Sequence, residues 1–85
     1  MEMFLFSVRD EKSGLYSPPF VAATQGMAER FIMEEMKKGN LWSSYPDDFV
    51  LVEVGQWCDS EGELISTERR QVGTLTRYKE MRDAG

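Results

Sequence analysis

The sequence predicts an α+β domain, in which a four-stranded antiparallel sheet carries one helix packed on one face, in the order β-β-α-β-β. Two alternating apolar segments, with one helical apolar stripe between them, support this prediction. With 85 residues, of which 41% are hydrophobic, the chain has enough apolar material for one modest core. We therefore expect a single domain over residues 1–66, followed by a basic, flexible tail over residues 67–85.

The first hairpin is predicted from the alternation of residues 3–8, which places aromatic side chains on one face of a strand. The polar residues 10–14 form a turn that ends in a glycine, so residues 15–17 are expected to pair back as the second strand. Pro18 and Pro19 lack the N–H donor that a sheet ladder needs. The chain is therefore expected to leave the sheet at these prolines.

The helix is predicted over residues 25–38, after Thr24 as its N-cap. Gly39 and Asn40 supply the stop signal. The apolar side chains that form one stripe at helical spacing are Met27, Ala28, Phe31, Ile32 and Met36. We expect this stripe to cover one face of the sheet.

The second hairpin begins with residues 48–55, which alternate and are rich in β-branched side chains, as in a central strand. A bulge at Gly55 would let the strand extend to residue 58. Residues 59–62 form a tight turn, and residues 63–66 return as the fourth strand. Residues 67–85 show no sustained apolar stripe, which predicts a mobile segment. Within it, residues 78–81 could dock or form a helical turn on a partner.

The residue types present argue against catalysis. The chain has no histidine and a single cysteine, Cys58, so it lacks the usual general base and the usual thiol nucleophile pair. No glycine-rich phosphate loop is present, and the acidic residues 59–63 fit a solvated turn better than a cation loop. We expect no enzyme activity, no cofactor and no metal. A reduced cysteine and a short apolar start indicate a cytoplasmic protein without a membrane segment.

Binding of single-stranded DNA is one of two functions that the sequence leaves open. Aromatic rings can stack on bases while arginine and lysine hold the phosphates. The candidate binding residues are Arg9, Tyr16, Phe20, Trp42, Trp57, Arg69, Arg70, Arg77 and Lys79. Every charged residue between 39 and 66 is acidic, and this segment would repel phosphate.

The alternative is a regulator that binds a protein or forms a homo-oligomer without touching nucleic acid. One helix shields only one face of a four-stranded sheet. The other face is therefore exposed to solvent, covered by the tail or buried against a partner. In this interpretation the rings of Phe20, Trp42 and Trp57 cover that second face.

A resemblance to a known family rests on the order of four short motifs across residues 3–65. They are Phe6-Ser7-Val8-Arg9-Asp10, Tyr16 with Pro18-Pro19-Phe20, Tyr45-Pro46-Asp47-Asp48-Phe49, and Val54-Gly55-Gln56-Trp57 with Asp59 and Gly62. In this order they resemble the small nonstructural protein of gokushovirus-type microviruses, which are single-stranded DNA phages.

The resemblance implies a protein of the infected bacterial cytoplasm that is absent from the virion and acts in genome replication. It implies a shift toward single-stranded DNA synthesis coupled to packaging, with single-stranded DNA, the replication initiator or a procapsid protein as the partner. It implies no catalytic residues.

Overall fold

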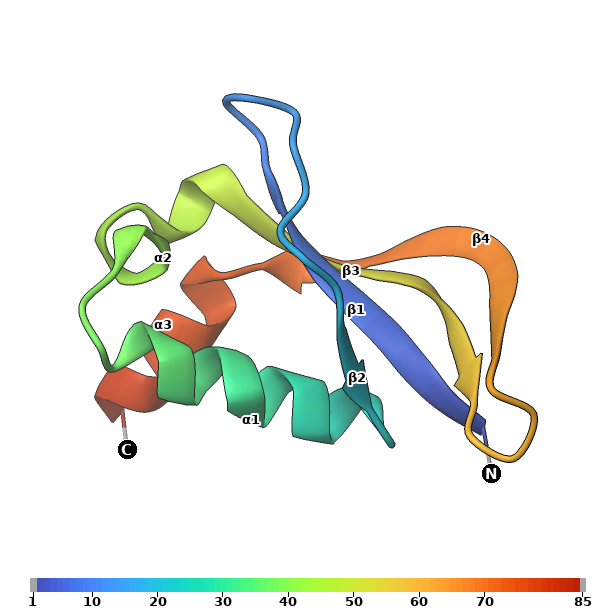
Figure 1. Ribbon diagram of the computed structural model, residues 1–85. Coiled ribbons are helices and arrows are strands. Elements are labelled where there is room, and N and C mark those ends of the chain that lie inside the picture. Colours follow the sequence, from blue (N-terminus) through green and yellow to red (C-terminus); the bar gives the residue numbers. More distant parts are fainter. Residues whose placement is uncertain (1, 85) are drawn as a thin grey trace.

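The computed structural model of the protein describes residues 2–84, with the side chains of residues 2–81. The elements in chain order are β1 (Glu2–Asp10), β2 (Phe20–Ala22), α1 (Gln25–Met36), α2 (Leu41–Ser44), the short 3-10 helix η1 (Pro46–Asp48), β3 (Phe49–Cys58), β4 (Glu63–Thr74) and α3 (Thr76–Ala84). The strands form one antiparallel sheet in the order β2-β1-β3-β4 (Figure 1). The predicted fold class is confirmed, and α2, η1 and α3 are additional to the predicted order.

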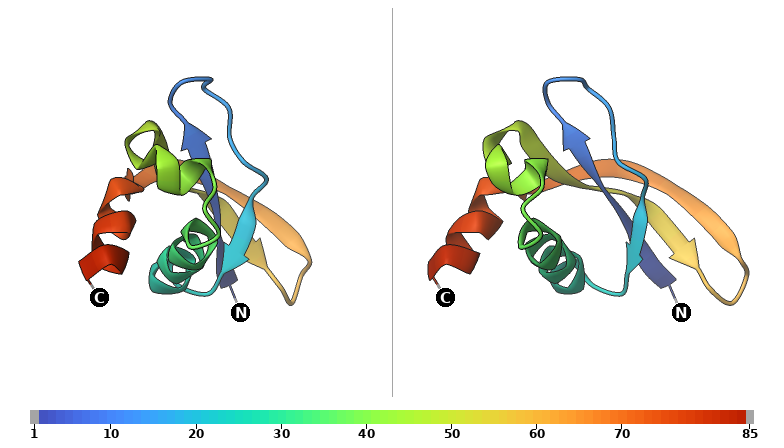
Figure 2. Two further views of the ribbon diagram at one scale, coloured as in Figure 1. Left: turned by 90° about the vertical axis from the view of Figure 1, so that its left-hand side faces the viewer. Right: turned by 60° about the vertical axis from the view of Figure 1, so that its left-hand side comes forward.

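The helices gather on one side of the sheet, as the rotated views in Figure 2 show. The core lies between this side of the sheet and the helices. Its fully buried members include Phe6 and Leu51 from the sheet, Ile32 from α1, and Leu75 and Tyr78 from the C-terminal part of the chain. Within residues 2–84, no helix covers the opposite face of the sheet.

Helix α1 begins where the sequence predicts, because the Thr24 side chain accepts a hydrogen bond of 3.2 Å from the backbone N–H of Met27. The helix ends at Met36, two residues before the predicted end, with Lys37 as its C-cap. Gly39 follows with a φ of 72°, a conformation that glycine adopts without steric cost.

Residues 15–17 pair back against β1 as predicted, through the bridge between Tyr16 and Arg9 and through backbone hydrogen bonds that β1 exchanges with residues 15 and 17, of 2.8 and 2.9 Å. The prediction that the chain leaves the sheet at the prolines is wrong, because the structure places strand β2 at Phe20–Ala22, directly after them. The chain returns to the sheet because Phe20 stacks on Phe6, at 6.0 Å between ring centroids. Burial of these aromatic rings on the core side outweighs the interruption of the ladder by the prolines.

Residues 67–84 do not form the flexible tail that the sequence predicts. Strand β4 continues to Thr74, and α3 then packs beside α1 on the helix side of the sheet. Leu75 donates a backbone hydrogen bond of 3.0 Å to Phe49, and Leu75 and Tyr78 are both fully buried. Among the described side chains, Leu75 directly before the helix and Tyr78 within it anchor α3, and two such residues are too few to produce a sustained stripe in the sequence.

The bulge at Gly55 is confirmed, because the pairing register of β3 shifts at this point against both β1 and β4. A Cβ atom on Gly55 would lie 3.1 Å from the carbonyl oxygen of Ile65, so a larger residue would crowd the neighbouring strand. Gly62 closes the β3–β4 turn with a φ of 64°.

Alkaline pH is expected to destabilise the fold through Tyr78. Its buried hydroxyl donates a hydrogen bond of 2.8 Å to Glu29, and burial and then this carboxylate raise the pKa of Tyr78 above its ordinary value of 10.0. The folded state keeps the proton, whereas the unfolded chain releases it near that value. The stability that depends on this proton is therefore complete below about pH 10 and is lost as the pH rises further, at a slope of up to about 1.4 kcal/mol per pH unit.

Urea denaturation at a series of pH values from about 8 to about 11 measures this loss. The variant Tyr78→Phe keeps the ring but has no ionisable group at this position, so its stability should fall less steeply above pH 10. Equal slopes for the two proteins would contradict the assignment.

Candidate functional site

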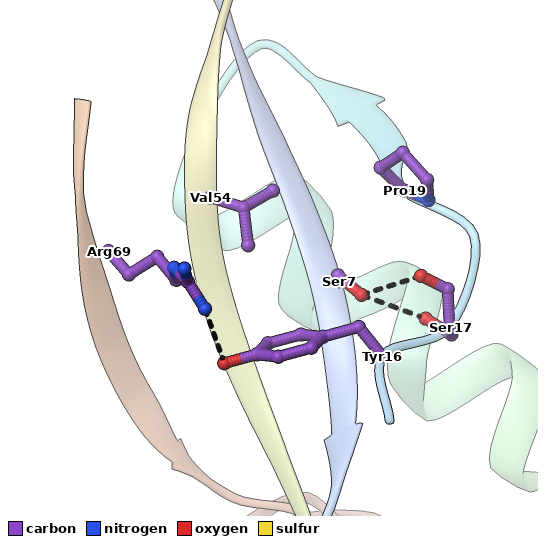
Figure 3. Close-up of a pocket in the computed structure, with 6 residues that line it drawn as sticks. All are labelled: Ser7, Tyr16, Ser17, Pro19, Val54 and Arg69. Carbon is purple, nitrogen blue, oxygen red and sulfur yellow. Dashed lines mark hydrogen bonds between the residues drawn. The ribbon is translucent and has the colours of Figure 1, made fainter. Parts of the chain in front are cut away.

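The helix-free face is the face of the sheet that points away from α1. Partners in an antiparallel ladder point to the same face, and Val8 and Leu51 are partners in the core. Their neighbours in the chain point the opposite way, which places Ser7 opposite Val52 and Arg9 opposite Val50 on the helix-free face. Figure 3 views this face with the helices behind the sheet.

Tyr16 lies across the helix-free face. Its ring passes over β1 and β3, and its hydroxyl accepts a hydrogen bond of 3.2 Å from the guanidinium of Arg69 on β4 (Figure 3). The guanidinium carbon of Arg69 lies 5.5 Å from the ring centroid, and that of Arg9 lies 6.0 Å from it. Because the Tyr16 residue is 39% exposed, an aromatic side chain with two positive charges near its ring is partly open to solvent.

The loop that carries Tyr16 is fixed to β1 through serine. Ser7 is 2% exposed, and its hydroxyl donates a hydrogen bond of 2.7 Å to the carbonyl oxygen of Ser17. The Ser17 hydroxyl in turn accepts a hydrogen bond of 3.0 Å from the backbone N–H of Val8. These two bonds hold the residue next to Tyr16 against the sheet, so the ring is positioned by a rigid strand.

The turn before Tyr16 is organised by Asp10. Its carboxylate accepts a hydrogen bond of 2.9 Å from the backbone N–H of Lys12 and a longer one from that of Ser13. The hydrogen bond from Lys12 is the largest cause that lowers the pKa of Asp10. Gly14 then reverses the chain with a φ of 76°, and the bridge between Tyr16 and Arg9 follows.

A shallow pocket of about 250 Å³ opens beside the Tyr16 ring. Its lining residues are Ser7, Tyr16, Ser17, Pro19, Val54 and Arg69 (Figure 3). Val54 points into it because side chains alternate along β3, so that Val54 follows Val52 on the helix-free face. The pocket therefore lies between the strands of this face and the connection that carries Tyr16 and Pro19.

The two arginines at the site differ in their charged neighbours. Arg9 lies 3.4 Å from the carboxylate of Glu11, and both side chains are partly exposed, so solvent screens this pair. Arg69 has the neutral hydroxyl of Tyr16 as its hydrogen-bond partner. The positive charge of Arg69 therefore remains available to an anion on this face.

The structure brings together three of the nine candidate residues, namely Arg9, Tyr16 and Arg69. Trp57 lies on the same face, where it pairs with Met3 and Leu64 toward the β3–β4 turn. It is partly buried and lies outside the lining of the pocket.

The other candidates lie on the helix side of the molecule. Phe20 and Trp42 are partly buried and pack against the core, so they do not cover the helix-free face. Arg70 points away from Arg69, toward Glu53 at 2.9 Å and Gln25 at 2.8 Å. In α3, Arg77 lies over the ring of Tyr78, at 5.9 Å from its centroid, and Lys79 is partly buried.

Sequence reasoning missed Ser7, Ser17, Pro19 and Val54. Ser7 carried a usable signal, because a small polar residue in an otherwise apolar strand requires a hydrogen-bond partner when it is buried. Val54 also carried a usable signal, because the alternation of β3 places it on the same face as Val52.

Among the described residues, no group of three or more histidine, cysteine, aspartate or glutamate side chains is placed to hold a metal ion. No helix in the described part of the chain has the length and apolar character needed to cross a membrane.

Comparison with protein families gives a match over residues 3–78, to the family described as phage ORF5 protein. The matched range runs from β1 into α3 and contains Tyr16 and the two arginines near its ring, Arg9 and Arg69. Comparisons with curated proteins and with solved structures give no match. Because the family match covers most of the chain, the protein belongs to the phage ORF5 protein family.

Proposed function

We propose that this phage protein acts in genome replication by binding single-stranded DNA on its helix-free face, without catalysing a reaction. It would act in the cytoplasm of the infected bacterium and favour the production of single-stranded DNA for packaging, as the resemblance to gokushovirus-type nonstructural proteins implies. The observation that carries the proposal is the partly exposed Tyr16 side chain, whose ring lies near the guanidinium groups of Arg9 and Arg69.

The chemistry of the three side chains suits a single strand. An unpaired base has two free faces and can stack on an aromatic ring, whereas bases in a duplex are stacked on each other. The two guanidinium groups near the ring can contact phosphates next to the stacked base. The hydrogen bonds of Ser17 with Ser7 and Val8 hold the loop that carries Tyr16 against the sheet. The Tyr16 side chain therefore loses little conformational freedom when a base stacks on it.

The charge distribution predicts modest affinity that depends strongly on salt. The net charge of −5 opposes the approach of DNA at long range. Several basic side chains outside the site are already paired with carboxylates, as in Lys37 with Glu34 and Lys38 with Glu35. The arginines of the site therefore supply much of the local attraction, and added salt should weaken it.

Replacing both Arg9 and Arg69 with glutamine is expected to lower the affinity for single-stranded DNA at low salt by at least about tenfold. If each arginine contacts one phosphate, the slope of log K against log salt should become shallower by about 1.4. Fluorescence anisotropy with labelled single-stranded and double-stranded oligonucleotides, over a series of salt concentrations, measures both quantities.

Arg70→Gln is the matched control for this experiment. It removes one arginine from the strand that carries Arg69, but from the opposite face, where Arg70 pairs with Glu53. We expect it to leave DNA binding nearly unchanged. Binding that is absent at low salt, or that all three arginines support equally, would contradict the proposed site.

Docking of a protein partner or a second copy remains the alternative function. It is favoured by apolar side chains on and near the helix-free face, where Val21 and Leu64 are 46% and 67% exposed. The partner would be the replication initiator or a procapsid protein. Sedimentation velocity at several protein concentrations tests self-association, and a change of Val21 and Leu64 to serine should abolish it if this face is the contact.

A further inference from the structure

We infer that the helix-free face packs against the same face of a second copy of the chain, so that self-association covers the site around Tyr16. The inference rests on the proposed DNA site, because it makes a second copy and single-stranded DNA competitors for one surface. Its basis is the order in which basic, apolar and acidic side chains follow one another along this face.

An apolar patch occupies the helix-free face between the Tyr16 site and the β3–β4 turn. Strand pairing and alternation place on it the side chains of Met3, Leu5, Val21, Val54, Trp57 and Leu64. All six are at least partly exposed, and Leu64 is the most open of them, at 67%. An exposed apolar patch of this size on a small domain is typical of a protein interface.

Opposite charges lie on the two sides of this patch. Toward one end, the guanidinium groups of Arg9 and Arg69 lie near the Tyr16 ring. At the other end, residues 59–63 of the β3–β4 connection contain carboxylates and no basic residue, and Glu61 is exposed at the tip of the turn. Among the described residues, no basic side chain forms an ion pair with Glu61. Its charge can therefore meet a basic group of a partner.

This order of side chains is complementary to itself under a two-fold rotation. Gly55, within the patch, lies midway along the chain between Val50, which pairs with Arg9, and Ser60 in the turn. At about 3.3 Å per residue, each end is roughly 17 Å from the middle. A two-fold axis between two aligned sheets, perpendicular to their strands and passing near Gly55, therefore brings the acidic turn of each copy to the arginines of the other. The two apolar patches meet at the axis.

The charge pattern favours a second copy over a different partner. A two-fold contact requires one surface to be complementary to itself, and this face meets that requirement without any further component. In the contact, the carboxylate of Glu61 approaches Arg69 of the other copy, where the proposed function places a phosphate. A second copy and a single strand therefore exclude each other from the Tyr16 site.

Two charge reversals in the full-length protein, Glu61→Arg and Arg69→Glu, test the contact by sedimentation equilibrium. We expect the unchanged protein to form a reversible dimer. Each reversal alone places like charges together at both ends of the two-fold contact, and should weaken self-association at least about tenfold. In an equal mixture of the two variants, opposite charges face each other again at both ends. The mixture should therefore form dimers about as tightly as the unchanged protein.

Glu80→Arg is the matched control for the reversals. Glu80 is exposed on α3, and its reversal changes the net charge by the same amount as Glu61→Arg does. We expect Glu80→Arg to keep self-association, and we expect a mixture of it with Arg69→Glu to form no heterodimer. Circular dichroism verifies that every variant is folded.

Competition with DNA is measured by sedimentation velocity of the labelled, unchanged protein at a concentration where it is dimeric. A short single-stranded oligonucleotide, long enough for one protein molecule, should convert the dimer into a complex of one protein with one strand. A double-stranded oligonucleotide of the same length is the control, and should leave most of the dimer intact.

The outcomes separate this inference from the proposed function. A protein that stays monomeric, dimers that neither reversal weakens, or a mixture that does not restore association would overturn the inference while DNA binding stands. Dimers that bind single-stranded DNA without dissociating would show that the Tyr16 site stays open, and would overturn it as well. If no DNA binds at low salt, the proposed function fails, whereas the mixing experiment needs no DNA and still decides whether the two faces pack together.

Discussion

Replacing Tyr78 with alanine is expected to lower the free energy of unfolding by about 3–5 kcal/mol, as for other large aromatic side chains removed from a core. Tyr78 is fully buried between α3 and the rest of the core, and its hydroxyl donates to Glu29 on α1. The change opens a cavity, removes this hydrogen bond and detaches α3. For a domain of this size, such a loss is a large part of the total stability.

Urea denaturation followed by circular dichroism measures this effect. The matched control is Met81→Ala in the same helix, because Met81 is 52% exposed and its truncation should change stability by less than about 0.5 kcal/mol. Similar losses for the two variants would mean that Tyr78 is not a core residue and that α3 does not stabilise the domain.

Replacing Tyr16 with alanine is expected to weaken the binding of single-stranded DNA by about 5- to 100-fold, since stacking of one base on an aromatic ring contributes about 1–3 kcal/mol. Tyr16 also accepts a hydrogen bond from Arg69 and so orients one of the phosphate-binding groups. Tyr16→Phe keeps the stacking surface and loses only this orientation. It should therefore retain most of the affinity.

Tyr45→Ala is the control for this comparison, because Tyr45 is a more exposed tyrosine, at 58%, that lies outside the pocket lining. Anisotropy titrations at one low salt concentration compare the variants, and circular dichroism verifies that each is folded. If Tyr16→Ala binds DNA as the unchanged protein does, the aromatic platform has no role in binding.

The sequence was sufficient for β1, β3, α1 and the bulge, because each leaves a strong local pattern. The alternation of β3, the cap at Thr24 and the isolated glycine at position 55 are such patterns. The positions of β2 and α3 depend on tertiary contacts instead. Phe20 joins the core by stacking on Phe6, and among the described side chains α3 docks through buried Tyr78 and through Leu75 directly before it. Local propensity does not record either contact.

The site was only partly predictable for the same reason. Arg9 and Tyr16 flank one turn, so the sequence alone suggests that they are close. Arg69 joins them only because β4 continues past Ser66, where the sequence predicts a flexible tail. The side chains of Arg69 and Arg70 point to opposite faces of the sheet because successive residues of a strand alternate between the two faces. Composition treats these two arginines as equivalent.

The pairing of β1 with β3 has a consequence for how fast the protein folds. These central strands are partners from Glu2 with Cys58 to Asp10 with Phe49, so the whole segment that contains β2 and α1 lies in the loop between them. The β3–β4 hairpin is local and can form within about 1–10 μs. Closing the larger loop costs chain entropy before its contacts form. The rate of folding should therefore be set by the meeting of β1 with a preformed hairpin, and changes in β1 should slow folding more than changes in α3.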